Sequence, residues 1–286
     1  EPGLTELIQE GLREGRFRAT SHLKEALRES QITFITVGTP FKKGNIDLSN
    51  VKKAAHQIGR LLPHLKPYPV VVVKSTVVPG TTETVVRKEL ERASGMEAGN
   101  FGLCMNPEFL REGSAVSDFL EPDRIVIGEW DARSGQVLDE LYQDFDCPRL
   151  HTSLANAELV KYTSNALLAT LISFSNEIAS LCEKIPGSDV ETVMEGLHLD
   201  QRLSPTVNGQ RVSPGILHYL RAGSGFGGSC LPKDVNALRS FGQKLKLKTP
   251  LLDAVMRINQ RRTAEVLRLL EKRIGKLRGH TVTVLG

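Results

Sequence analysis

The sequence predicts an α/β protein, with a partial doubly wound parallel sheet followed by an all-helical domain built on one long central helix. Apolar runs alternate with helical patterns through residues 1–150, as expected where strands and helices take turns along the chain. Val70–Val73 is apolar at every position, which is typical of a strand buried on both faces of a parallel sheet. Residues 156–185 carry apolar side chains at helical spacing and contain neither proline nor glycine, so one long helix is expected there.

Length and composition narrow the class of protein. A chain of 286 residues is long enough for two domains with cores of their own. The formal charge is only +4, with both signs mixed along the chain, which does not indicate a nucleic-acid partner. We find no apolar run of membrane-spanning length and no signal peptide, so neither membrane insertion nor secretion is expected.

The cysteines bear on the cellular compartment. Cys104, Cys147, Cys182 and Cys230 are widely spaced and form no paired motif. Such spacing fits reduced thiols in a cytoplasmic protein better than a disulfide framework or a zinc site. No bound metal is expected.

The remaining elements follow from apolar runs, helical periodicity and turn residues. Strands are expected at Ile32–Val37, Val70–Val73, Phe101–Met105 and Arg124–Ile127. Leu48–Leu62 has a helical pattern and follows Asp47, a residue type that favours the N-cap. Further helical patterns cover residues 188–197, 233–246 and 249–274. Residues 201–224, rich in Pro, Gly, Ser and Asn, are expected to form a loop, and residues 281–286 a last strand.

Polar, turn-forming residues follow three of the predicted strands. They are Val-Gly-Thr-Pro at 37–40, Lys-Ser-Thr at 74–76 and Asn106–Glu112. Ligands bind at the carboxyl ends of strands in open α/β sheets, so we expect these segments to form the rim of a nucleotide-binding crevice. No G-x-G-x-x-G turn joins a strand to a helix, and the glycines at 223–228 follow no strand, so they are rejected as a cofactor fingerprint.

Cys230 is the candidate nucleophile. It follows the glycine-rich residues 225–228 and precedes Pro232, which fits the first turn of a helix. A cysteine at a helix N-terminus, beside a cation such as Lys233, is biased toward the thiolate, which can hold an acyl or hemithioacetal intermediate. The alternative is a small buried cysteine beside a loop, a common role for an unpaired thiol.

Three pairs of polar residues are spaced four apart: Glu108 and Glu112, Lys161 and Asn165, Cys230 and Asp234. On a helix this spacing places both side chains on one side, which applies to the two glutamates if a helix starts after Pro107. Each pair alone is most often a solvated face. Together they supply what the oxidation of an alcohol to an acid requires: a base, a thiolate for the aldehyde, a cation and an amide for the oxyanion, and a carboxylate that activates water.

Several motifs occur together in the order seen in one family. The most specific is Gly-Phe-Gly-Gly-Ser-Cys-Leu-Pro-Lys-Asp at 225–234. The others are Glu-Pro-Gly-Leu at 1–4, Val-Gly-Thr-Pro at 37–40, Lys-Ser-Thr-Val at 74–77, Asn-Pro-Glu-Phe-Leu-Arg-Glu-Gly at 106–113, Pro-Asp-Arg-Ile-Val-Ile-Gly at 122–128 and Lys-Tyr-Thr-Ser-Asn-Ala at 161–166. With them, essentially the whole chain resembles the nucleotide-sugar 6-dehydrogenases, the UDP-glucose and GDP-mannose dehydrogenase family.

The resemblance implies an NAD-dependent, four-electron oxidation of the sugar C6 alcohol to a uronic acid, with two NAD consumed. Cys230 resembles the nucleophile that forms the thiohemiacetal and the thioester. Lys161 and Asn165 resemble the oxyanion pair, and Asp234 the residue that assists through water. Glu108 resembles the residue that activates water for thioester hydrolysis.

The resemblance also implies binding residues. Thr76 is similar to the residue that positions a catalytic water near the cofactor. The expected cofactor-binding residues are Gly38, Thr39, Thr76, Glu112 and Lys233. The expected substrate-binding residues are Glu108, Phe109, Leu110, Glu112, Lys161, Asn165, Arg202, Tyr219 and Gly227. Either Arg202 or Arg211 is expected to reach the neighbouring subunit's substrate, because residues 203–214 look inserted relative to the family pattern.

The family fold implies three parts in this chain. Residues 1–150 would form a dinucleotide-binding domain without its first βαβ unit, where family members hold the glycine fingerprint. Residues 151–275 would form a helical domain that carries the catalytic cysteine and dimerises through the long helix. Residues 276–286 would begin a second α/β nucleotide-binding domain. The chain is therefore expected to be part of a longer homodimeric protein.

The resemblance to the family allows more than one sugar substrate. Residues 122–128 and 161–183 are more similar to UDP-glucose dehydrogenases, which makes oxidation of UDP-glucose to UDP-glucuronate the leading expectation. Residues 1–20 and 94–102 and the Leu-Pro after Cys230 lean toward GDP-mannose dehydrogenases, and a UDP-N-acetylhexosamine is the third choice. A different class is a catalytically silent module that binds a sugar nucleotide and dimerises, although it would not need the full set of reactive residues.

Overall fold

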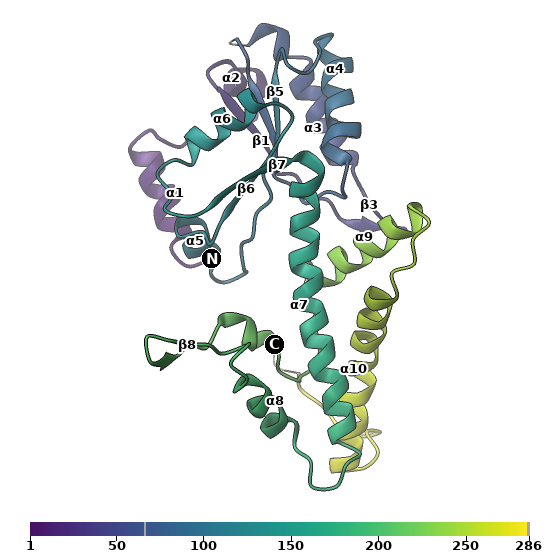
Figure 1. Ribbon diagram of the computed structural model, residues 1–286. Coiled ribbons are helices and arrows are strands. Elements are labelled where there is room, and N and C mark those ends of the chain that lie inside the picture. The colour runs from purple at the N-terminus through teal and green to yellow at the C-terminus, as the bar shows by residue number, and fades with distance from the viewer. Residues whose placement is uncertain (66, 285–286) are drawn as a thin grey trace. The chain divides into compact units, whose positions relative to one another are not determined.

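The computed structural model describes residues 1–65 and 67–284, which fall into two compact units, Glu1–Thr163 and Ser164–Gly286. The first unit contains a sheet with helices packed against it, and the second is mostly helical (Figure 1). The α/β class predicted from the sequence is confirmed.

The strands of the first unit form one sheet in the order β1-β4-β5-β6-β7. They are β1 (Ile32–Ile35), β4 (Val70–Val73), β5 (Gly102–Met105), β6 (Ile125–Glu129) and β7 (Arg149–Ser153). β1, β4 and β5 are parallel to one another, as are β6 and β7, whereas β5 and β6 pair antiparallel. The sequence predicts the first four strands but not β7, because Arg-Leu-His-Thr-Ser has no apolar run and pairs only with β6 at the sheet edge.

Helices and short elements connect these strands. The helices of the first unit are α1 (Leu4–Arg13), α2 (Leu23–Arg28), α3 (Ser49–Gly59), α4 (Lys88–Ser94), α5 (Ala115–Leu120) and α6 (Ala132–Leu141). The short elements are the hairpin strands β2 (Phe41–Lys42) and β3 (Asn45–Ile46), the 3-10 turn η1 (Leu62–His64) and the π-helical turn η2 (Thr82–Arg87).

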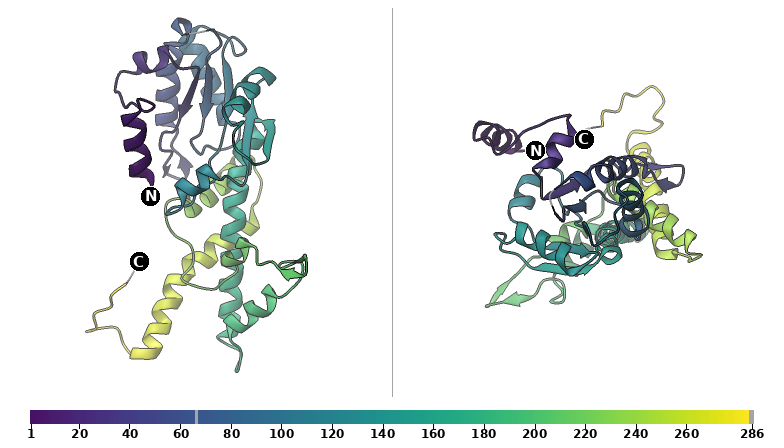
Figure 2. Two further views of the ribbon diagram at one scale, coloured as in Figure 1. Left: turned by 90° about the vertical axis from the view of Figure 1, so that its left-hand side faces the viewer. Right: turned by 90° about the horizontal axis from the view of Figure 1, so that it is seen from above.

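Two apolar clusters cover opposite faces of the sheet, because successive side chains of a strand point to opposite faces. On one face, Val71 and Val73 belong to a cluster with residues of α3 and α4. On the other face, Val70 and Val72 pack with Leu138 of α6. The valines of β4 are at most 1% exposed, as predicted for a strand buried on both sides. Figure 2 shows the sheet between these two groups of helices.

Helix α3 corresponds to the helix predicted at Leu48–Leu62, but its N-cap is Leu48 instead of Asp47. Asp47 nevertheless stabilises the start of the helix, because its Oδ1 accepts the Ser49 N–H at 2.9 Å. That N–H is one of the donors that a helix N-terminus leaves without an intrahelical partner.

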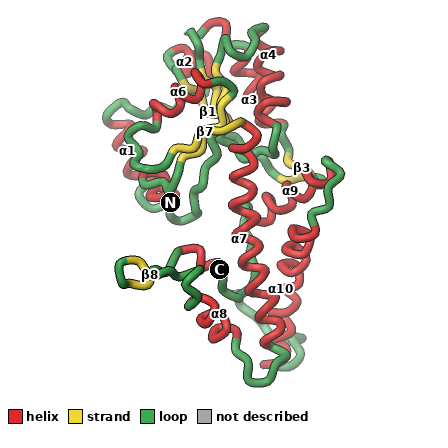
Figure 3. The backbone as a smooth tube through the Cα atoms, viewed as in Figure 1, coloured by secondary structure: helices red, strands yellow, loops and turns green. Residues whose placement is uncertain are grey.

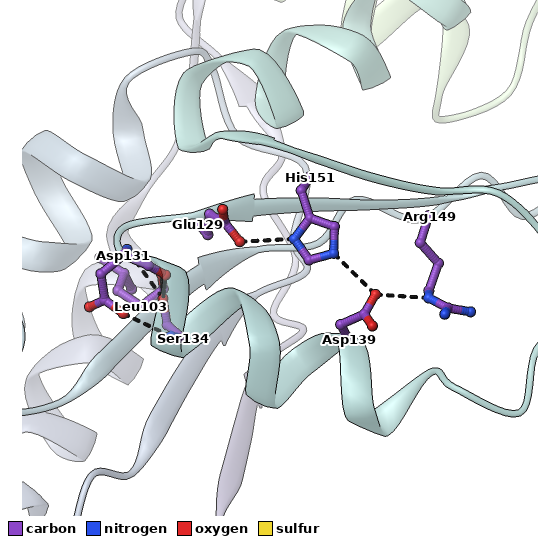
Figure 4. Close-up of polar contacts among 7 residues, drawn as sticks. All are labelled: Leu103, Glu129, Asp131, Ser134, Asp139, Arg149 and His151. Carbon is purple, nitrogen blue, oxygen red and sulfur yellow. Dashed lines mark hydrogen bonds and ion pairs between the residues drawn. The ribbon is translucent and has the colours of Figure 1, made fainter.

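A cluster of charged side chains joins β6, β7 and α6 (Figure 4). His151 lies between two carboxylates, with Nδ1 2.9 Å from Glu129 Oε2 and Nε2 3.0 Å from Asp139 Oδ1. Arg149 Nε donates to the same Asp139 oxygen at 2.8 Å. The hydrogen bond to Glu129, and to a lesser extent the one to Asp139, raises the pKa of His151. The cluster therefore fastens the edge strand β7 to α6 by charge-assisted bonds.

The second unit is organised by long helices. α7 (Leu154–Cys182) begins in the first unit and continues through the second, as predicted for residues 156–185. It is followed by α8 (Val190–His198), α9 (Leu231–Lys244) and α10 (Pro250–Ile274). α10 runs beside α7 in the same direction, because Ser173 Oγ donates to the Val255 carbonyl at 3.3 Å and Arg268 Nη2 to Glu183 Oε2 at 2.9 Å.

The segment predicted as a loop at 201–224 contains two short elements. A hairpin of β8 (Thr206–Val207) and β9 (Gln210–Arg211) lies within it (Figure 3), followed by the 3-10 helix η3 (Gly215–Tyr219). The hairpin turn is Asn208-Gly209, with φ of 50° and 77°. An Asn-Gly pair between short strands is a strong hairpin signal, so this element could have been predicted.

The strand predicted at 281–286 does not form over residues 281–284, and residues 285–286 lie outside the described residues. A strand satisfies its backbone groups by pairing with a neighbour. No described segment pairs with residues 281–284, so the prediction is wrong for them.

Candidate active site

The carboxyl ends of β1, β4 and β5 lie side by side because these strands are parallel neighbours. Ser75 Oγ donates to the Val37 carbonyl at 2.7 Å, and Thr39 Oγ1 donates to the Thr76 carbonyl at 2.7 Å. These bonds fix the first two predicted polar segments against each other. At Gly38 a Cβ would meet no atom within 4 Å, so a ligand can approach its backbone closely.

A half-buried lysine at this edge was singled out by no pair or spacing in the sequence. Lys74 Nζ donates to Asn106 Oδ1 at 2.7 Å, and Tyr142 Oη donates to the same oxygen at 2.7 Å. Burial lowers the pKa of Lys74 to about 8, while the nearby Glu108 opposes that change. An amine with such a pKa can exchange a proton near neutral pH. The available signal was its position directly after the all-valine strand.

Glu108 and Lys161 form an ion pair in the first unit. Lys161 Nζ lies 3.0 Å from Glu108 Oε1, and the side chains are 7% and 31% exposed. The other Glu108 oxygen, Oε2, accepts the Leu110 N–H at 2.7 Å. The ammonium also lies 5.6 Å from the centroid of the Phe109 ring. The structure thus brings together two residues predicted to be catalytic, Glu108 and Lys161, which were not predicted as a pair, and the predicted substrate-binding residues Phe109 and Leu110.

No helix starts directly after Pro107. Residues 106–111 have no regular structure, and α5 begins only at Ala115. The Glu108 carboxylate instead bonds the Leu110 N–H, a local contact that competes with a helix. Glu112 lies in an exposed turn. The condition under which Glu108 and Glu112 would share a helix face is therefore not met.

Glu158 of α7 is a buried carboxyl group near the site that the sequence did not reveal. Its side chain is completely buried. Glu158 Oε1 accepts the Thr82 N–H at 2.7 Å and the Thr82 hydroxyl at 2.6 Å, and Oε2 accepts the Gly80 N–H at 2.5 Å. Burial raises the pKa of Glu158 to about 7, although these hydrogen bonds favour the charged form. Glu158 therefore ties the segment after Thr76 to the helix that carries Lys161.

Cys230 lies at the N-terminus of α9, as predicted. It is the N-cap residue, Pro232 is in the first turn, and the Asp234 N–H donates to the Cys230 carbonyl at 2.9 Å. Cys230 is exposed, which argues against the alternative of a buried structural cysteine. At Gly227 and Gly228 a Cβ would meet no atom within 4 Å, so the approach to the thiol is sterically open.

Asp234 joins two predicted site residues within the second unit. Its side chain is only 1% exposed. Asn165 Nδ2 donates to Asp234 Oδ2 at 2.6 Å, and Lys233 Nζ donates to Oδ1 at 2.6 Å. Lys233, expected beside the thiolate and the cofactor, is thus paired with Asp234 in the structure. The amide and the carboxylate expected to act together are in direct contact.

The remaining predicted binding residues lie in the segment before Cys230. Arg202 forms two bonds from Nε to the Asp200 carboxylate, at 3.0 and 3.1 Å, and its side chain is 88% exposed. Arg211 Nη1 donates to the Leu199 carbonyl at 2.6 Å. Tyr219 is half-buried at the end of η3. Both arginines thus bond to the two residues that follow α8 in the sequence, Leu199 and Asp200.

No group of three or more His, Cys, Asp or Glu side chains in the described residues could hold a metal ion. Among the helices that the structure describes, none has the length and apolar character needed to span a membrane. All four cysteines are free thiols.

The fold and the site together define a class. An α/β sheet in which β1, β4 and β5 are parallel, with open glycine and hydroxyl groups at their carboxyl ends, is the architecture of dinucleotide-binding proteins. In this chain it precedes a helical unit that presents a cysteine at a helix N-terminus. The combination defines a class of dinucleotide-binding proteins with an exposed thiol at a helix N-terminus.

The chain belongs to the UDP-glucose/GDP-mannose dehydrogenase family. Residues 1–146 match the family's NAD binding domain, and residues 155–261 match its central domain. The family resemblance expected from the sequence is confirmed. NAD is the cofactor of the matching domain family.

Curated relatives of two types are equally similar. The chain is 40% identical over 273 residues to a GDP-mannose 6-dehydrogenase of Pseudomonas putida, covering 95% of this chain and 60% of that protein. It is 40% identical over 287 residues to a UDP-glucose 6-dehydrogenase of Bacillus subtilis, covering 100% of this chain and 58% of that protein. The chain thus spans about 60% of the length of these relatives.

Solved structures of both types are also similar. A UDP-glucose dehydrogenase of Pyrobaculum islandicum superposes with a TM-score of 0.87 at 43% identity, covering 98% of this chain and 61% of that chain. A GDP-mannose dehydrogenase of Pseudomonas aeruginosa, solved as a ternary complex, has a TM-score of 0.68 at 38% identity, with 95% and 60% covered.

Proposed function

We propose that this protein oxidises the C6 alcohol of a nucleotide sugar to the uronic acid with NAD, through a thioester on Cys230. One observation carries the proposal: in a chain of this family, Cys230 is exposed at the N-terminus of α9, next to the buried Asn165–Asp234 pair. Gly38, Thr39 and Thr76 at the strand ends would hold the cofactor, and the open backbone at Gly38 fits that role. NAD supplies the electron acceptor for each of the two oxidations.

The chain's own residues account for the steps that follow formation of the aldehyde. The Cys230 sulfur adds to the aldehyde carbon, and the carbonyl oxygen takes up the negative charge. Lys161 and Asn165 are suited to stabilise that oxyanion. Loss of the second hydride from this carbon converts the thiohemiacetal into a thioester with Cys230. Glu108 then takes a proton from water, the water oxygen attacks the thioester carbon, and the C–S bond breaks to release the acid and the thiolate.

UDP-glucose is the proposed substrate. The similarity to the Pyrobaculum islandicum UDP-glucose dehydrogenase, at 43% identity, supports it. GDP-mannose is the first alternative, because the GDP-mannose 6-dehydrogenase of Pseudomonas putida is as similar to this chain as the Bacillus subtilis enzyme. A UDP-N-acetylhexosamine is the second alternative, supported by a UDP-N-acetylmannosamine dehydrogenase structure from Pyrococcus horikoshii at 26% identity.

The experiment that separates these substrates is steady-state NADH formation by the full natural chain. UDP-glucose, GDP-mannose and a UDP-N-acetylhexosamine are supplied separately at equal concentration with NAD. The proposal expects the highest kcat/KM with UDP-glucose. NADH from none of the three would instead favour the catalytically silent sugar-nucleotide module.

The four free cysteines are consistent with the reducing cytoplasm, which we propose as the location of this protein.

A homodimer through α7 is also proposed. Leu167, Phe174 and Leu181 recur every seven residues and are 49%, 44% and 55% exposed. Leu171 and Ile178 lie between them and are half-buried. Together the five residues have the 3–4 spacing of a helix-pairing seam. Burying this apolar stripe removes hydrophobic surface from water.

The dimer is tested by light scattering at micromolar concentration. Phe174→Glu places a charge in the seam and is expected to give a monomer, whereas Glu191→Ala on the exposed surface of α8 keeps the dimer. A monomeric wild-type protein would contradict the proposal.

A further inference from the structure

The loop before Cys230 is held by a side chain of α10. Asn259 Oδ1 accepts the Phe226 N–H at 2.8 Å, and Asn259 Nδ2 donates to the Phe226 carbonyl at 2.8 Å. One amide thus satisfies both backbone groups of Phe226, as a paired strand would. Because residues 225–229 have no regular structure, these groups have no helix or sheet to bond.

A second contact fixes the same loop at Gly223. Arg262 Nε donates to the Gly223 carbonyl at 2.9 Å, and the Gly223 N–H donates to Asn176 Oδ1 at 2.8 Å. Arg262 is 5% exposed, and its Nη1 is paired with Glu265 at 2.5 Å. The arginine is buried and held by this ion pair, whose glutamate is partly exposed at 24%, so it cannot move without breaking the pair.

The loop sequence fits this attachment. Gly225 has φ of 96°, and a Cβ there would lie 2.4 Å from Asn259 Oδ1, so only glycine lets the amide come this close. Phe226 is 8% exposed and packs in a cluster with Val235 of α9 and Val255 of α10. Phe226, four residues before Cys230, is thus held by polar contacts of its backbone and by apolar contacts of its ring.

We propose that Asn259 and Arg262 are positioning residues for the Cys230 nucleophile. They fix the chain on the N-terminal side of the cysteine, while α9 fixes it on the other side through the Cys230 carbonyl. Between Phe226 and Cys230, Gly227 and Gly228 meet no neighbouring atoms where a Cβ would lie. The thiol's position therefore depends on the two anchors. This inference rests on the proposed function of Cys230.

Loss of positioning has a specific signature in the proposed reaction. The first oxidation forms an aldehyde, and the sulfur must capture that aldehyde before it leaves the site. A misplacement of about 1 Å costs about 100-fold in rate when the reacting groups are otherwise held in place. A displaced thiol therefore lets aldehyde escape, whereas a merely less stable protein loses both oxidations in proportion.

The test measures aldehyde released per NADH by the full natural chain, with semicarbazide as the trap. Asn259→Ala removes both bonds to Phe226, and Asn259→Asp retains the acceptor but removes the donor. Gln260→Ala is the matched control, because Gln260 is the exposed neighbour on α10. Amide hydrogen exchange of residues 223–228 is followed in the same variants below the melting temperature.

Both Asn259 variants are expected to release at least about tenfold more aldehyde per NADH than wild type, with faster exchange at 223–228 and unchanged KM for NAD. The control should match wild type in both measurements. Wild-type partitioning and wild-type exchange in both Asn259 variants would overturn the inference while leaving the proposed function intact. If wild type itself forms no NADH, the proposed function fails, and the exchange data then decide only whether Asn259 holds the loop.

Discussion

Lys161 Nζ lies 3.0 Å from Glu108 Oε1, and the lysine side chain is 7% exposed whereas that of the glutamate is 31% exposed. The ammonium is therefore enclosed, while the carboxylate still reaches solvent. Its second oxygen is held by the Leu110 N–H at 2.7 Å. This geometry fixes the orientation of a carboxylate that can still contact water, as the proposed hydrolysis of the thioester requires.

Glu108→Gln is expected to trap the covalent intermediate. The amide keeps the shape of the side chain but cannot accept a proton from water, so hydrolysis should slow by roughly 100-fold or more. Intact-protein mass spectrometry after mixing with UDP-glucose and NAD should show a uronyl adduct. The adduct should be absent from the double variant that also carries Cys230→Ser. Glu121→Gln, at an exposed position in the same connection, should show no adduct. An adduct-free Glu108→Gln protein with wild-type turnover would contradict the assignment.

Glu158→Gln is expected to flatten the pH dependence of stability. In the folded protein the pKa of Glu158 is raised from 4.5 to about 7, so the folded state holds its proton more tightly than the unfolded chain does. The stability that this provides is fully present below pH 4.5 and is lost as the pH rises to about 7, on the order of 3 kcal/mol.

The measurement for Glu158 is the difference in melting temperature between wild type and variant at pH 5 and at pH 8. The wild type should lose stability relative to Glu158→Gln over this interval. Glu177→Gln, the same change at an exposed position of α7, should show a constant difference. A constant difference for Glu158→Gln would show that burial does not control this carboxyl group.

The cluster around His151 predicts a second pH dependence. Glu129 and Asp139 raise the pKa of His151, so its ion pairs stabilise the fold fully below pH 6.5 and lose that effect as the pH rises through the folded pKa. The histidine side chain is 39% exposed, so solvent screening limits the contribution to about 1 kcal/mol or less. His151→Gln should therefore destabilise at pH 5.5 more than at pH 9, measured by urea unfolding. Equal effects at both pH values, or an effect in the exposed control His64→Gln, would argue against it.

Gly128→Ala should destabilise the junction between β6 and α7. A Cβ at this position would lie 2.6 Å from the Ala157 Cβ and 3.1 Å from the Leu154 Cα. Overpacking of this kind costs about 1–3 kcal/mol. Gly196→Ala in α8, where a Cβ would meet nothing within 4 Å, should raise stability by up to about 1 kcal/mol. Thermal melts of the two variants should shift in opposite directions, and a neutral Gly128→Ala would contradict the close packing.

Much of the fold could be predicted because its signals are local. The valines of β4 and the uninterrupted helical pattern of α7 determine their elements by periodicity and burial. The position of Cys230 followed from Pro232 and the glycines before it. β7 could not be predicted, because a polar edge strand depends on its neighbour β6 and on the ion pairs of His151.

The site was less predictable where distant segments meet. Glu158 looks like any solvent-facing glutamate of an amphipathic helix, and only the fold brings Gly80 and Thr82 to it. Asn259 lies 33 positions from Phe226, so no spacing indicates their contact. No helix starts after Pro107, where the Glu108 carboxylate bonds the Leu110 N–H and so competes with a helix.

The most direct test of the account is the number of NADH molecules formed per nucleotide sugar consumed. The full natural chain is supplied with limiting UDP-glucose and excess NAD, and NADH, sugar and acid are quantified in the same reaction. The account predicts two NADH and one uronic acid per sugar, with net acid formation abolished in Cys230→Ser. One NADH per sugar with an aldehyde product from the wild-type protein would show that Cys230 does not carry the second oxidation.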